Sequence, residues 1–200
     1  ASGAQVIDGS LKFNGSSTYL KRTPGSAGNR KTFTWSGWVK RSKLSTWQML
    51  LSAGSSASDR TFIGFVGSDT ATYENQVGVV HLASGIVTGA VYLNPKLRDI
   101  SEFYHIVISA DLTNSTANDR VKGYINGVEV DVTVDNAFEN ADTQFNNTVV
   151  HETKKAANSS EYIDGHVTQV YFIDGQALEP TEFGFTDPLT NTWKPKKYTG

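Results

Sequence analysis

Short runs of alternating or continuous apolar residues recur along this chain, and clusters of Gly, Ser, Asn and Asp separate them. This pattern is typical of β-strands joined by turns, whereas the sustained 3.6-residue period of amphipathic helices is nearly absent. The proline of the segment Glu179–Phe183 suits the first position of one short helical turn. The runs predict about eleven strands, over Ser10–Phe13, Thr18–Lys21, Thr32–Arg41, Trp47–Ala53, Thr61–Val66, Val77–Ala83, Gly89–Leu93, Phe103–Asp111, Arg120–Ile125, Val128–Val134 and Tyr162–Ile173.

Many short strands with hairpin turns and minimal helix favour an all-β fold, a jelly-roll sandwich of two antiparallel sheets. Side chains alternate between the two faces of a strand. In Phe103–Asp111 one face should therefore carry Tyr104, Ile106, Ile108 and Ala110, and the other His105 and Ser109. In Thr32–Lys40, Phe33, Trp35 and Val39 should point one way. Trp38 points the other way, toward either a groove or a second layer.

Length and charge limit the classes of function. The 200 residues predict a single domain, and four Trp, eight Tyr and ten Phe are enough to fill its core. The formal net charge of −2 gives no broad cationic surface, so we expect no nucleic-acid partner. No stretch reaches the eighteen apolar residues of a membrane span, so we expect a soluble chain without membrane insertion.

Several kinds of site are not supported by any motif. The chain has no cysteine, which excludes thiolate metal ligands and a cysteine nucleophile. Its four histidines lack the spacings of zinc sites, so we interpret them as surface or sheet-face residues; they are His81, His105, His151 and His166. Neither the Gly-x-Ser-x-Gly motif of serine hydrolases nor a phosphate-binding glycine loop occurs.

The dipeptide Asn126-Gly127 predicts a tight hairpin, because a type I′ turn needs positive φ at both of its central residues. On the return strand, the valines at 128, 130, 132 and 134 should face the core, while Glu129 and Asp131 face solvent or a groove. Retaining glycosidases need two carboxyl groups about 5 Å apart. The positions where a further Glu would fall hold Thr133 and Val134. We therefore predict that this strand is not catalytic.

A glycan site is predicted where aromatic side chains lie near polar loops, because the apolar faces of sugar rings stack on aromatic planes. The aromatic candidates are Trp47, Tyr73 and Tyr92. The loops 55–60 and 68–75 add hydrogen-bonding candidates, namely Asp59, Arg60, Asp69 and Asn75. Alternatively, the aromatic side chains pack in the core or between subunits, and the polar ones only solvate loops.

No cofactor is required by this interpretation, although calcium needs no linear signature in a β-sandwich. The turn residues that could supply oxygen ligands are Asn14, Asp164, Asp174 and Asp8. The alternative is that they stabilise ordinary turns, as Asn and Asp commonly do. The segment 136–160 is polar and rich in Asn, which predicts a long connection, and loops of that length are often functional.

Several stretches resemble the concanavalin A-like, laminin G-like jelly rolls, in a version found in virion proteins of tailed phages. The matching stretches are Ser10–Leu20, Thr32–Lys40, Phe103–Ser109, Val121–Gly127 and Tyr162–Leu178. The closing segments Glu179–Gly184 and Trp193–Gly200 are similar to the phage version in particular. One departure is Val167-Thr-Gln-Val170, where many relatives carry Ile-Asp-Glu-Val. The two missing carboxylates weaken the case for an inherited calcium site.

The resemblance implies a non-enzymatic module on the external surface of a phage particle, in a tail fibre or a similar protein, that binds host-surface carbohydrate. It would meet other virion subunits, as a homo-oligomer such as the trimer of a fibre, and the chain would be complete or one module of a longer virion protein. Two alternatives are a decoration or tail-assembly protein that mediates subunit contacts, and a glycoside hydrolase. The family hosts lectins, glucanases and structural modules on one fold.

Overall fold

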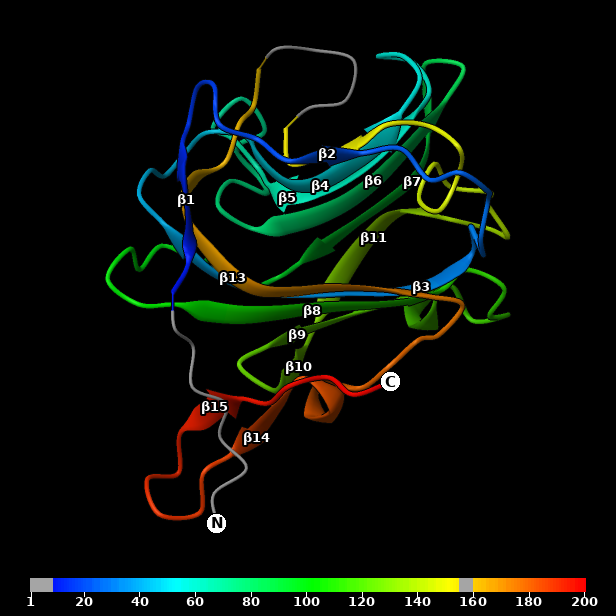
Figure 1. Ribbon diagram of the computed structural model, residues 1–200. Coiled ribbons are helices and arrows are strands. Elements are labelled where there is room, and N and C mark those ends of the chain that lie inside the picture. The colour runs from blue at the N-terminus through cyan, green and yellow to red at the C-terminus, as the bar shows by residue number, and fades with distance from the viewer. Residues whose placement is uncertain (1–8, 155–159) are drawn as a thin grey trace.

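The computed structural model describes residues 9–154 and 160–200, and in this part of the chain two antiparallel sheets face each other (Figure 1). The six-stranded sheet has the order β1-β13-β3-β8-β9-β10. Its strands are β1 (Leu11–Asn14), β13 (Asp164–Asp174), β3 (Thr32–Arg41), β8 (Tyr104–Asp111), β9 (Val121–Ile125) and β10 (Val128–Val130). The predicted all-β jelly-roll sandwich is confirmed.

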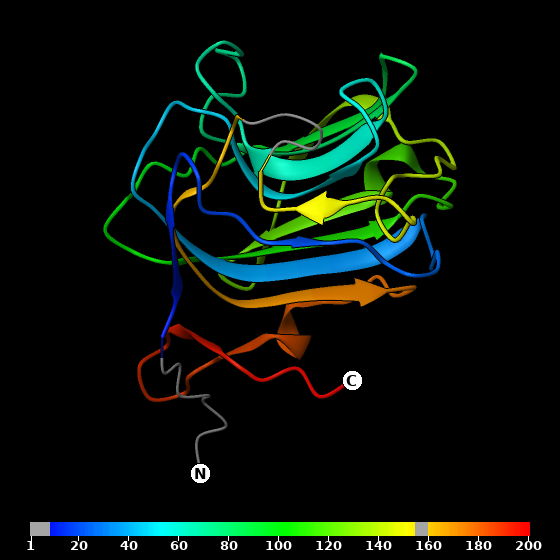
Figure 2. The same ribbon diagram turned by 45° about the horizontal axis from the view of Figure 1, so that its top comes forward.

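The seven-stranded sheet has the order β11-β7-β6-β5-β4-β12-β2 in the described residues. It is curved, and its concave surface is turned away from the six-stranded sheet (Figures 1 and 2). Its strands are β11 (Val132–Ala137), β7 (Ile86–Leu93), β6 (Val77–Ala83), β5 (Arg60–Phe65), β4 (Gln48–Gly54), β12 (His151–Glu152) and β2 (Lys21–Arg22). Among these, β12 was not predicted, and the sequence analysis predicted no order of strands in either sheet.

The core lies between the sheets and follows the predicted alternation. From the six-stranded sheet, Phe33, Trp35, Ile106 and Ile108 point inward and are buried. From the opposite sheet, residues such as Ile63, Phe65, Val79, Val91 and Leu93 meet them in one apolar cluster. Because side chains alternate along each strand, every second residue of these strands is left for the outer faces of the two sheets.

The return strand predicted over 128–134 is in fact two strands in two different sheets. β10 pairs with β9 in the six-stranded sheet, whereas β11 pairs with β7 in the seven-stranded sheet. The chain changes sheets at Asp131, which carries no strand pairing. The prediction that Val128 faces the core is therefore wrong, since 66% of it is exposed at the sheet edge. Val130, Val132 and Val134 do pack against the core.

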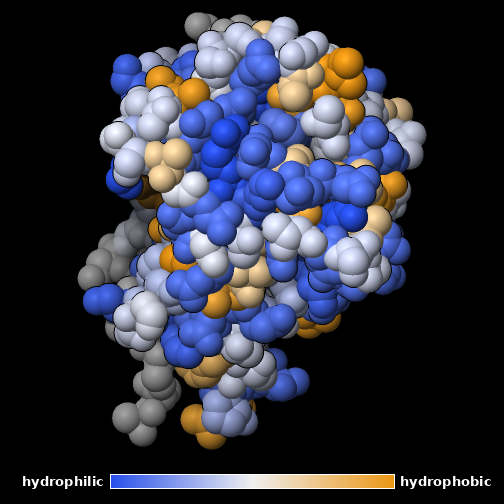
Figure 3. All heavy atoms as spheres, turned by 90° about the vertical axis from the view of Figure 1, so that its right-hand side faces the viewer, coloured by the Kyte–Doolittle hydropathy of each residue, from blue (hydrophilic) through white to orange (hydrophobic). Residues whose placement is uncertain are grey.

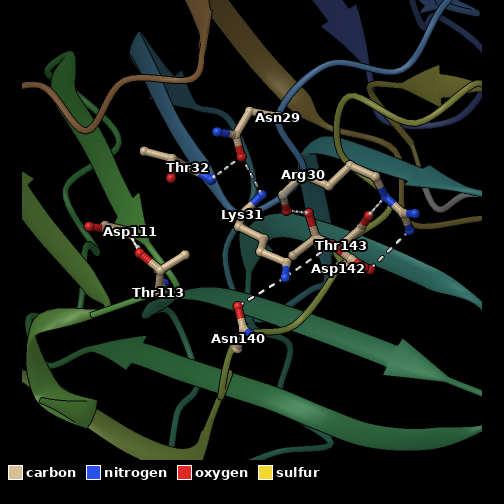
Figure 4. A network of polar contacts seen from close by, with 9 residues as sticks. All are labelled: Asn29, Arg30, Lys31, Thr32, Asp111, Thr113, Asn140, Asp142 and Thr143. Atoms are coloured by element: carbon tan, nitrogen blue, oxygen red, sulfur yellow. Dashed lines mark hydrogen bonds and ion pairs between the residues drawn. The ribbon is translucent and has the colours of Figure 1, made fainter. Parts of the chain in front are cut away.

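The described part of the long connection 136–160 is not merely a polar loop. Phe138 and Phe145 are buried and close one end of the core. Arg30 fixes this loop by donating hydrogen bonds to the carbonyl oxygens of Thr143 and Asp142, at 2.6 and 3.0 Å (Figure 4). The outer surface at this end of the molecule is largely hydrophilic (Figure 3). The described part of this loop therefore completes the hydrophobic core with two buried aromatic side chains.

A third layer covers the outer face of the six-stranded sheet. It consists of η2 (Pro180–Glu182), β14 (Gly184–Thr186) and β15 (Trp193–Pro195), which lie below that sheet in Figure 1. Phe183 packs with Val107 and Tyr124 of the sheet. Trp38 is 9% exposed and stacks on His105 beneath this region, and its edge also lines a hollow of about 390 Å³ beside Pro195 of β15.

Helical structure is confined to short turns in the described residues. These are η1 (Ala117–Asp119) and η2, of three residues each, and η2 falls in the predicted segment Glu179–Phe183. In residues 9–154 and 160–200, no helix is long and apolar enough to cross a membrane.

Candidate functional site

The concave outer face of the seven-stranded sheet carries an aromatic surface. In β5, Ile63 and Phe65 point to the core, so Phe62 points outward, and the same alternation turns Tyr92 of β7 outward. We define the concave-face cluster as the residues that pack together there: Met49, Phe62, Val66, Val80, Ala90 and Tyr92, with the half-buried Trp47, Tyr73 and Leu82. Unlike the outer face of the other sheet, no third layer of strands covers it in the described residues.

Tyr73 forms a flat platform on this face. Its ring lies on the ring of Tyr92, with centroids 3.8 Å apart and planes within 8°. Its hydroxyl donates a 2.6 Å hydrogen bond to Asp135 Oδ1. That bond raises the pKa of Tyr73 to about 12, because the neighbouring carboxylate disfavours the phenolate. The Tyr73 ring is therefore held at two points, and Tyr92 covers only one of its two faces.

Trp47 forms a second platform, just before β4. Its indole N–H donates a 2.6 Å hydrogen bond to Asp69 Oδ1, and its ring packs edge-on against Phe62 at 5.9 Å. Gly67 lies so close that an added Cβ would be 2.8 Å from the indole ring. The side chain is thus fixed by a carboxylate on one edge and by backbone and ring packing on the others.

The loop that carries Tyr73 is anchored through Asn75. The side-chain oxygen of Asn75 accepts hydrogen bonds from Arg41 Nη1 at 3.1 Å and from the backbone N–H of Ser45 at 2.9 Å. Asn75 is 3% exposed and positions the loop through these two hydrogen bonds, and contact with a ligand stays a prediction for it. Burial lowers the pKa of Arg41 to about 10, which makes the amide acceptor important for stability.

Asp59 lies away from the two platforms, whereas Arg60 stands at the border of the cluster that contains them. Asp59 stabilises the turn before β5, where it accepts hydrogen bonds from the Ser84 backbone N–H and the Ser56 hydroxyl. Those contacts place it at the end of β5 opposite to Trp47. The Arg60 guanidinium stands 5.7 Å from the Phe62 ring centre, and burial lowers its pKa. Arg60 therefore borders the concave-face cluster, whereas Asp59 has a turn role.

A polar hollow of about 390 Å³ opens beside Trp47. Three chain segments meet there: the loop 42–47, light blue at the left of Figure 1, the turn after β5, and the approach to β13. Its lining comprises Gly15, Lys43, Ser45, Thr46, Trp47, Gly67, Ser68, Asp69, Glu161, Tyr162 and Asp164. Aromatic platforms next to a polar hollow are the usual ingredients of a site for a small polar ligand.

Of the calcium candidates, Asn14 and Asp164 are cross-strand partners, whereas Asp174 lies at the opposite end of β13. The side-chain oxygen of Asn14 accepts three backbone N–H groups of its own turn, from Ser16, Ser17 and Thr18. Asp174 accepts hydrogen bonds from the Asn29 backbone and the Asn146 side chain. Asp164 lines the hollow. Asp8 lies outside the described residues. Across residues 9–154 and 160–200, no group of three or more ligating side chains could hold a metal ion.

The two acids of the hairpin lie at a sheet edge. Glu129, 3.8 Å from Lys122, is on the edge strand β10, and Asp131 is exposed at the crossover between sheets. A third carboxyl group does come near, because Glu179 accepts a 3.1 Å hydrogen bond from the Tyr124 hydroxyl. None of these acids lines the hollow beside Trp47. The pair does not face the aromatic platforms.

Sequence reasoning missed Phe62, Asp135, Glu161 and Tyr162 as members of this region. Phe62 and Asp135 had a usable signal in their strand parity, because each is next to an inward-facing apolar residue, Ile63 and Val134 respectively. Glu161 and Tyr162 had none. Their place in the hollow depends on contacts such as the Met49 N–H hydrogen bond to the Glu161 carbonyl oxygen, at 3.1 Å.

The comparison with protein families matches residues 14–183 to the model described as the concanavalin A-like lectin/glucanases superfamily. No curated protein matches the chain significantly in sequence.

Solved structures share the fold at low sequence identity. Domain 4 of the extracellular arabinanase AbnA from Geobacillus stearothermophilus, in complex with arabinotriose, has a TM-score of 0.60 and 18% identity, with 86% of this chain and 73% of that chain covered. The Ruminococcus gnavus IT-sialidase CBM40 has a TM-score of 0.58 and 13% identity, with 88% and 94% covered. A mutant of the NanB sialidase from Streptococcus pneumoniae has a TM-score of 0.54 and 16% identity. The match covers 90% of this chain but only 29% of that chain.

Proposed function

Because this chain belongs to the concanavalin A-like lectin/glucanases superfamily, we propose that it is a non-catalytic module that binds glycans on the concave face of its seven-stranded sheet. The observation that carries the proposal is the pair of preset aromatic platforms, Tyr73 and Trp47, each held by a carboxylate. Structures with the same fold include one in complex with arabinotriose and one bound to α2,3-sialyllactose. Those ligands support the class of function but do not identify the glycan.

The geometry suits a short oligosaccharide. Trp47 leads into β4, and Tyr92, which lies under Tyr73, belongs to β7, three strand spacings away in the sheet order. At the usual spacing the two platforms are roughly 14 Å apart. Sugar rings would stack on the open ring faces, and the polar groups of the hollow would bind hydroxyls. Because the platforms are already fixed in the free protein, binding costs little side-chain entropy.

The proposal of a non-catalytic role rests on where the acids of the hairpin lie. A retaining hydrolase needs two carboxyl groups facing one another across the scissile bond. Here Glu129 is on an exposed edge strand and pairs with Lys122, and it is remote from the aromatic platforms. We expect no release of reducing ends from bacterial polysaccharides. Turnover that is abolished by Glu129→Gln would overturn this part of the proposal.

We also propose, from the resemblance of the closing segments to virion proteins of tailed phages, that the module acts outside the cell on the surface of a particle. Its partners would be host-surface carbohydrate and neighbouring virion subunits. Labelling of intact particles with an antibody against this chain, followed by electron microscopy, tests the location. An internal location in the particle would contradict it.

Substitution of Tyr73 tests the glycan site directly. We expect Tyr73→Ala to weaken binding by about tenfold, as loss of an aromatic stacking contact would do. Tyr73→Phe keeps the ring on Tyr92 and should lose less. A glycan array finds the ligand of the native protein, and titration calorimetry then measures the affinity of each variant.

The matched control is Leu189→Ala, which removes an apolar side chain that is 92% exposed on the C-terminal layer. It should bind as the native protein does. Equal affinity of Tyr73→Ala and the native protein would remove the platform from the site. Failure of the native protein to bind any glycan would instead favour the alternative role in subunit contacts.

A further inference from the structure

The charges around the proposed site are mostly negative. Three acidic residues, Asp69, Glu161 and Asp164, line the hollow beside Trp47, and Lys43 is the one cation among the described residues of the lining. The second platform also carries a carboxylate, since Asp135 accepts the Tyr73 hydroxyl hydrogen bond. The site itself is defined by its aromatic platforms and its hollow; the charges restrict which sugars can enter it.

Two further cations lie near the concave-face cluster, but neither lines the hollow in the described residues. Arg60 stands over Phe62; burial lowers its pKa, and the nearby Glu161 raises it to a smaller extent. Arg41 is buried beneath the loop that carries Tyr73, where it donates a hydrogen bond to Asn75. With Glu161 offset by Arg60, Asp69 and Asp164 still outnumber Lys43 in the lining of the hollow.

The acids of the hollow are held in place by the surrounding chain. Asp69 is fixed through the 2.6 Å hydrogen bond from the Trp47 indole. The backbone N–H of Asp164 donates to Gln48 Oε1 at 3.1 Å, and its carboxyl group packs on Gly15, where an added Cβ would come within 2.8 Å of Oδ2. Fixed carboxylates cannot swing away to make room for a second negative charge.

We infer that this site selects uncharged or amino-bearing sugars and rejects sugars that carry a carboxylate, such as sialic acids and uronic acids. The inference rests on the proposed glycan function and restricts its ligand class. A sugar carboxylate bound near Asp69 or Asp164 would meet like charges and lose part of its own hydration. The sialyllactose seen with one similar fold therefore does not extend to this chain.

The test compares matched ligands with the native protein by titration calorimetry at low salt. The panel consists of neutral oligosaccharides, including lactose and arabinotriose, of glucosamine oligomers, and of sialyllactose and galacturonate oligomers. We expect the neutral or amino-bearing sugars to bind at least about tenfold more tightly than their acidic counterparts. Added salt should reduce this preference, because it screens repulsion between exposed charges.

Charge-neutral variants give the decisive comparison. Asp69→Asn keeps an oxygen acceptor for the Trp47 indole and removes the charge, and Asp164→Asn removes the second charge. The measured quantity is the ratio of the affinities for a neutral sugar and its acidic counterpart, and the double variant should reduce this ratio several-fold relative to the native protein. Glu139→Gln, which neutralises an exposed acid in the loop after β11, is the matched control and should leave this ratio unchanged.

The outcomes separate this inference from the function on which it rests. The selectivity and the glycan function are both supported if the native protein binds neutral sugars more tightly than acidic ones and the double variant reduces this difference. Equal or tighter binding of sialyllactose or galacturonate by the native protein overturns the selectivity and leaves the glycan function intact. Absence of binding to every ligand of the panel and of a wider array overturns the proposed function, and the selectivity with it.

Discussion

At the scale of single residues, His105 shows how a polar side chain is used in the interior of this fold. It is 1% exposed on the outer face of the six-stranded sheet. The Trp193 indole donates to its Nδ1 at 2.9 Å, and Ser36 Oγ lies 2.9 Å from its Nε2. Because an indole N–H can only donate, Nδ1 must be unprotonated, and Nε2–H donates to Ser36. Both ring nitrogens are satisfied only in the neutral form.

This arrangement predicts a pH-dependent stability. Burial lowers the pKa of His105 from 6.5 to about 4. Between these values the unfolded chain binds a proton that the folded chain does not, so the free energy of unfolding falls as the pH falls. The stabilising contribution is complete above pH 6.5 and decreases by about 3 kcal/mol by pH 4. Urea unfolding followed by tryptophan fluorescence at several pH values measures it.

The variant His105→Gln isolates this residue from other titrating groups. Burial also lowers the pKa of His81 and His151, so part of the pH dependence should remain in the variant. Between pH 4 and 6.5, the slope of the unfolding free energy against pH should be smaller than in the native protein by about 1.4 kcal/mol per pH unit, which corresponds to one proton. Identical slopes would show that the pKa of His105 in the folded protein is not lowered.

At the scale of elements, the C-terminal hairpin of β14 and β15 acts as a cover for one sheet. The ring of Trp193 lies against two glycines, and an added Cβ at either Gly127 or Gly184 would come within 2.4 Å of it. Gly127 also has a φ of +81°, in the turn predicted from Asn126-Gly127. The absence of side chains at these two positions lets the tryptophan approach the sheet and hydrogen-bond to His105.

We expect Gly184→Ala to displace Trp193, because the new methyl group would overlap its ring. The variant should lose the hydrogen bond to His105, lose near-ultraviolet circular dichroism, and become less stable by about 1–3 kcal/mol, as overpacked sites do. Limited proteolysis should also cut the C-terminal segment faster. Gly25→Ala is the control, since no heavy atom lies within 4 Å of a Cβ built there. An unchanged spectrum for Gly184→Ala would show that the cover tolerates the methyl group.

At the scale of the whole molecule, the two outer faces of the sandwich differ in how much of them is covered by other parts of the chain. The C-terminal layer buries the outer face of the six-stranded sheet, whereas the concave face of the other sheet keeps half-buried aromatic platforms. A single such shallow surface gives modest affinity, and useful attachment then comes from several copies acting together.

Display of three copies on a trimeric scaffold tests this expectation. The trimer should bind a surface coated with the target polysaccharide about 10²–10⁴-fold more tightly than the monomer, if the copies can engage at once. Biolayer interferometry at low and high ligand density measures the gain. A trimer that carries Tyr73→Ala in every copy should lose most of it. A gain that survives this substitution would place the binding surface elsewhere.

Much of the site's composition followed from the sequence, but its arrangement did not. Trp47, Asp69, Tyr73 and Tyr92 were all predicted, and the structure brings them to one region of the concave face. The hydrogen bond between Tyr73 and Asp135 joins residues 62 positions apart, which no local pattern encodes. Asn75 was predicted as a ligand-binding residue because it is a polar residue in a loop. Its hydrogen-bond partner Arg41 lies in a buried strand 34 residues earlier, which the sequence pattern could not indicate.

The sequence by itself determined most of the longer strands and the inward direction of their apolar residues, because side-chain alternation is a local property with a period of two. It did not determine which of the outward-facing residues would meet solvent. That was decided by long-range contacts: the crossover at Asp131 divides one predicted strand between two sheets, and Trp193 of the C-terminal hairpin packs on His105. Local periodicity states only that a residue points outward, and the next layer of chain decides whether that outside is water.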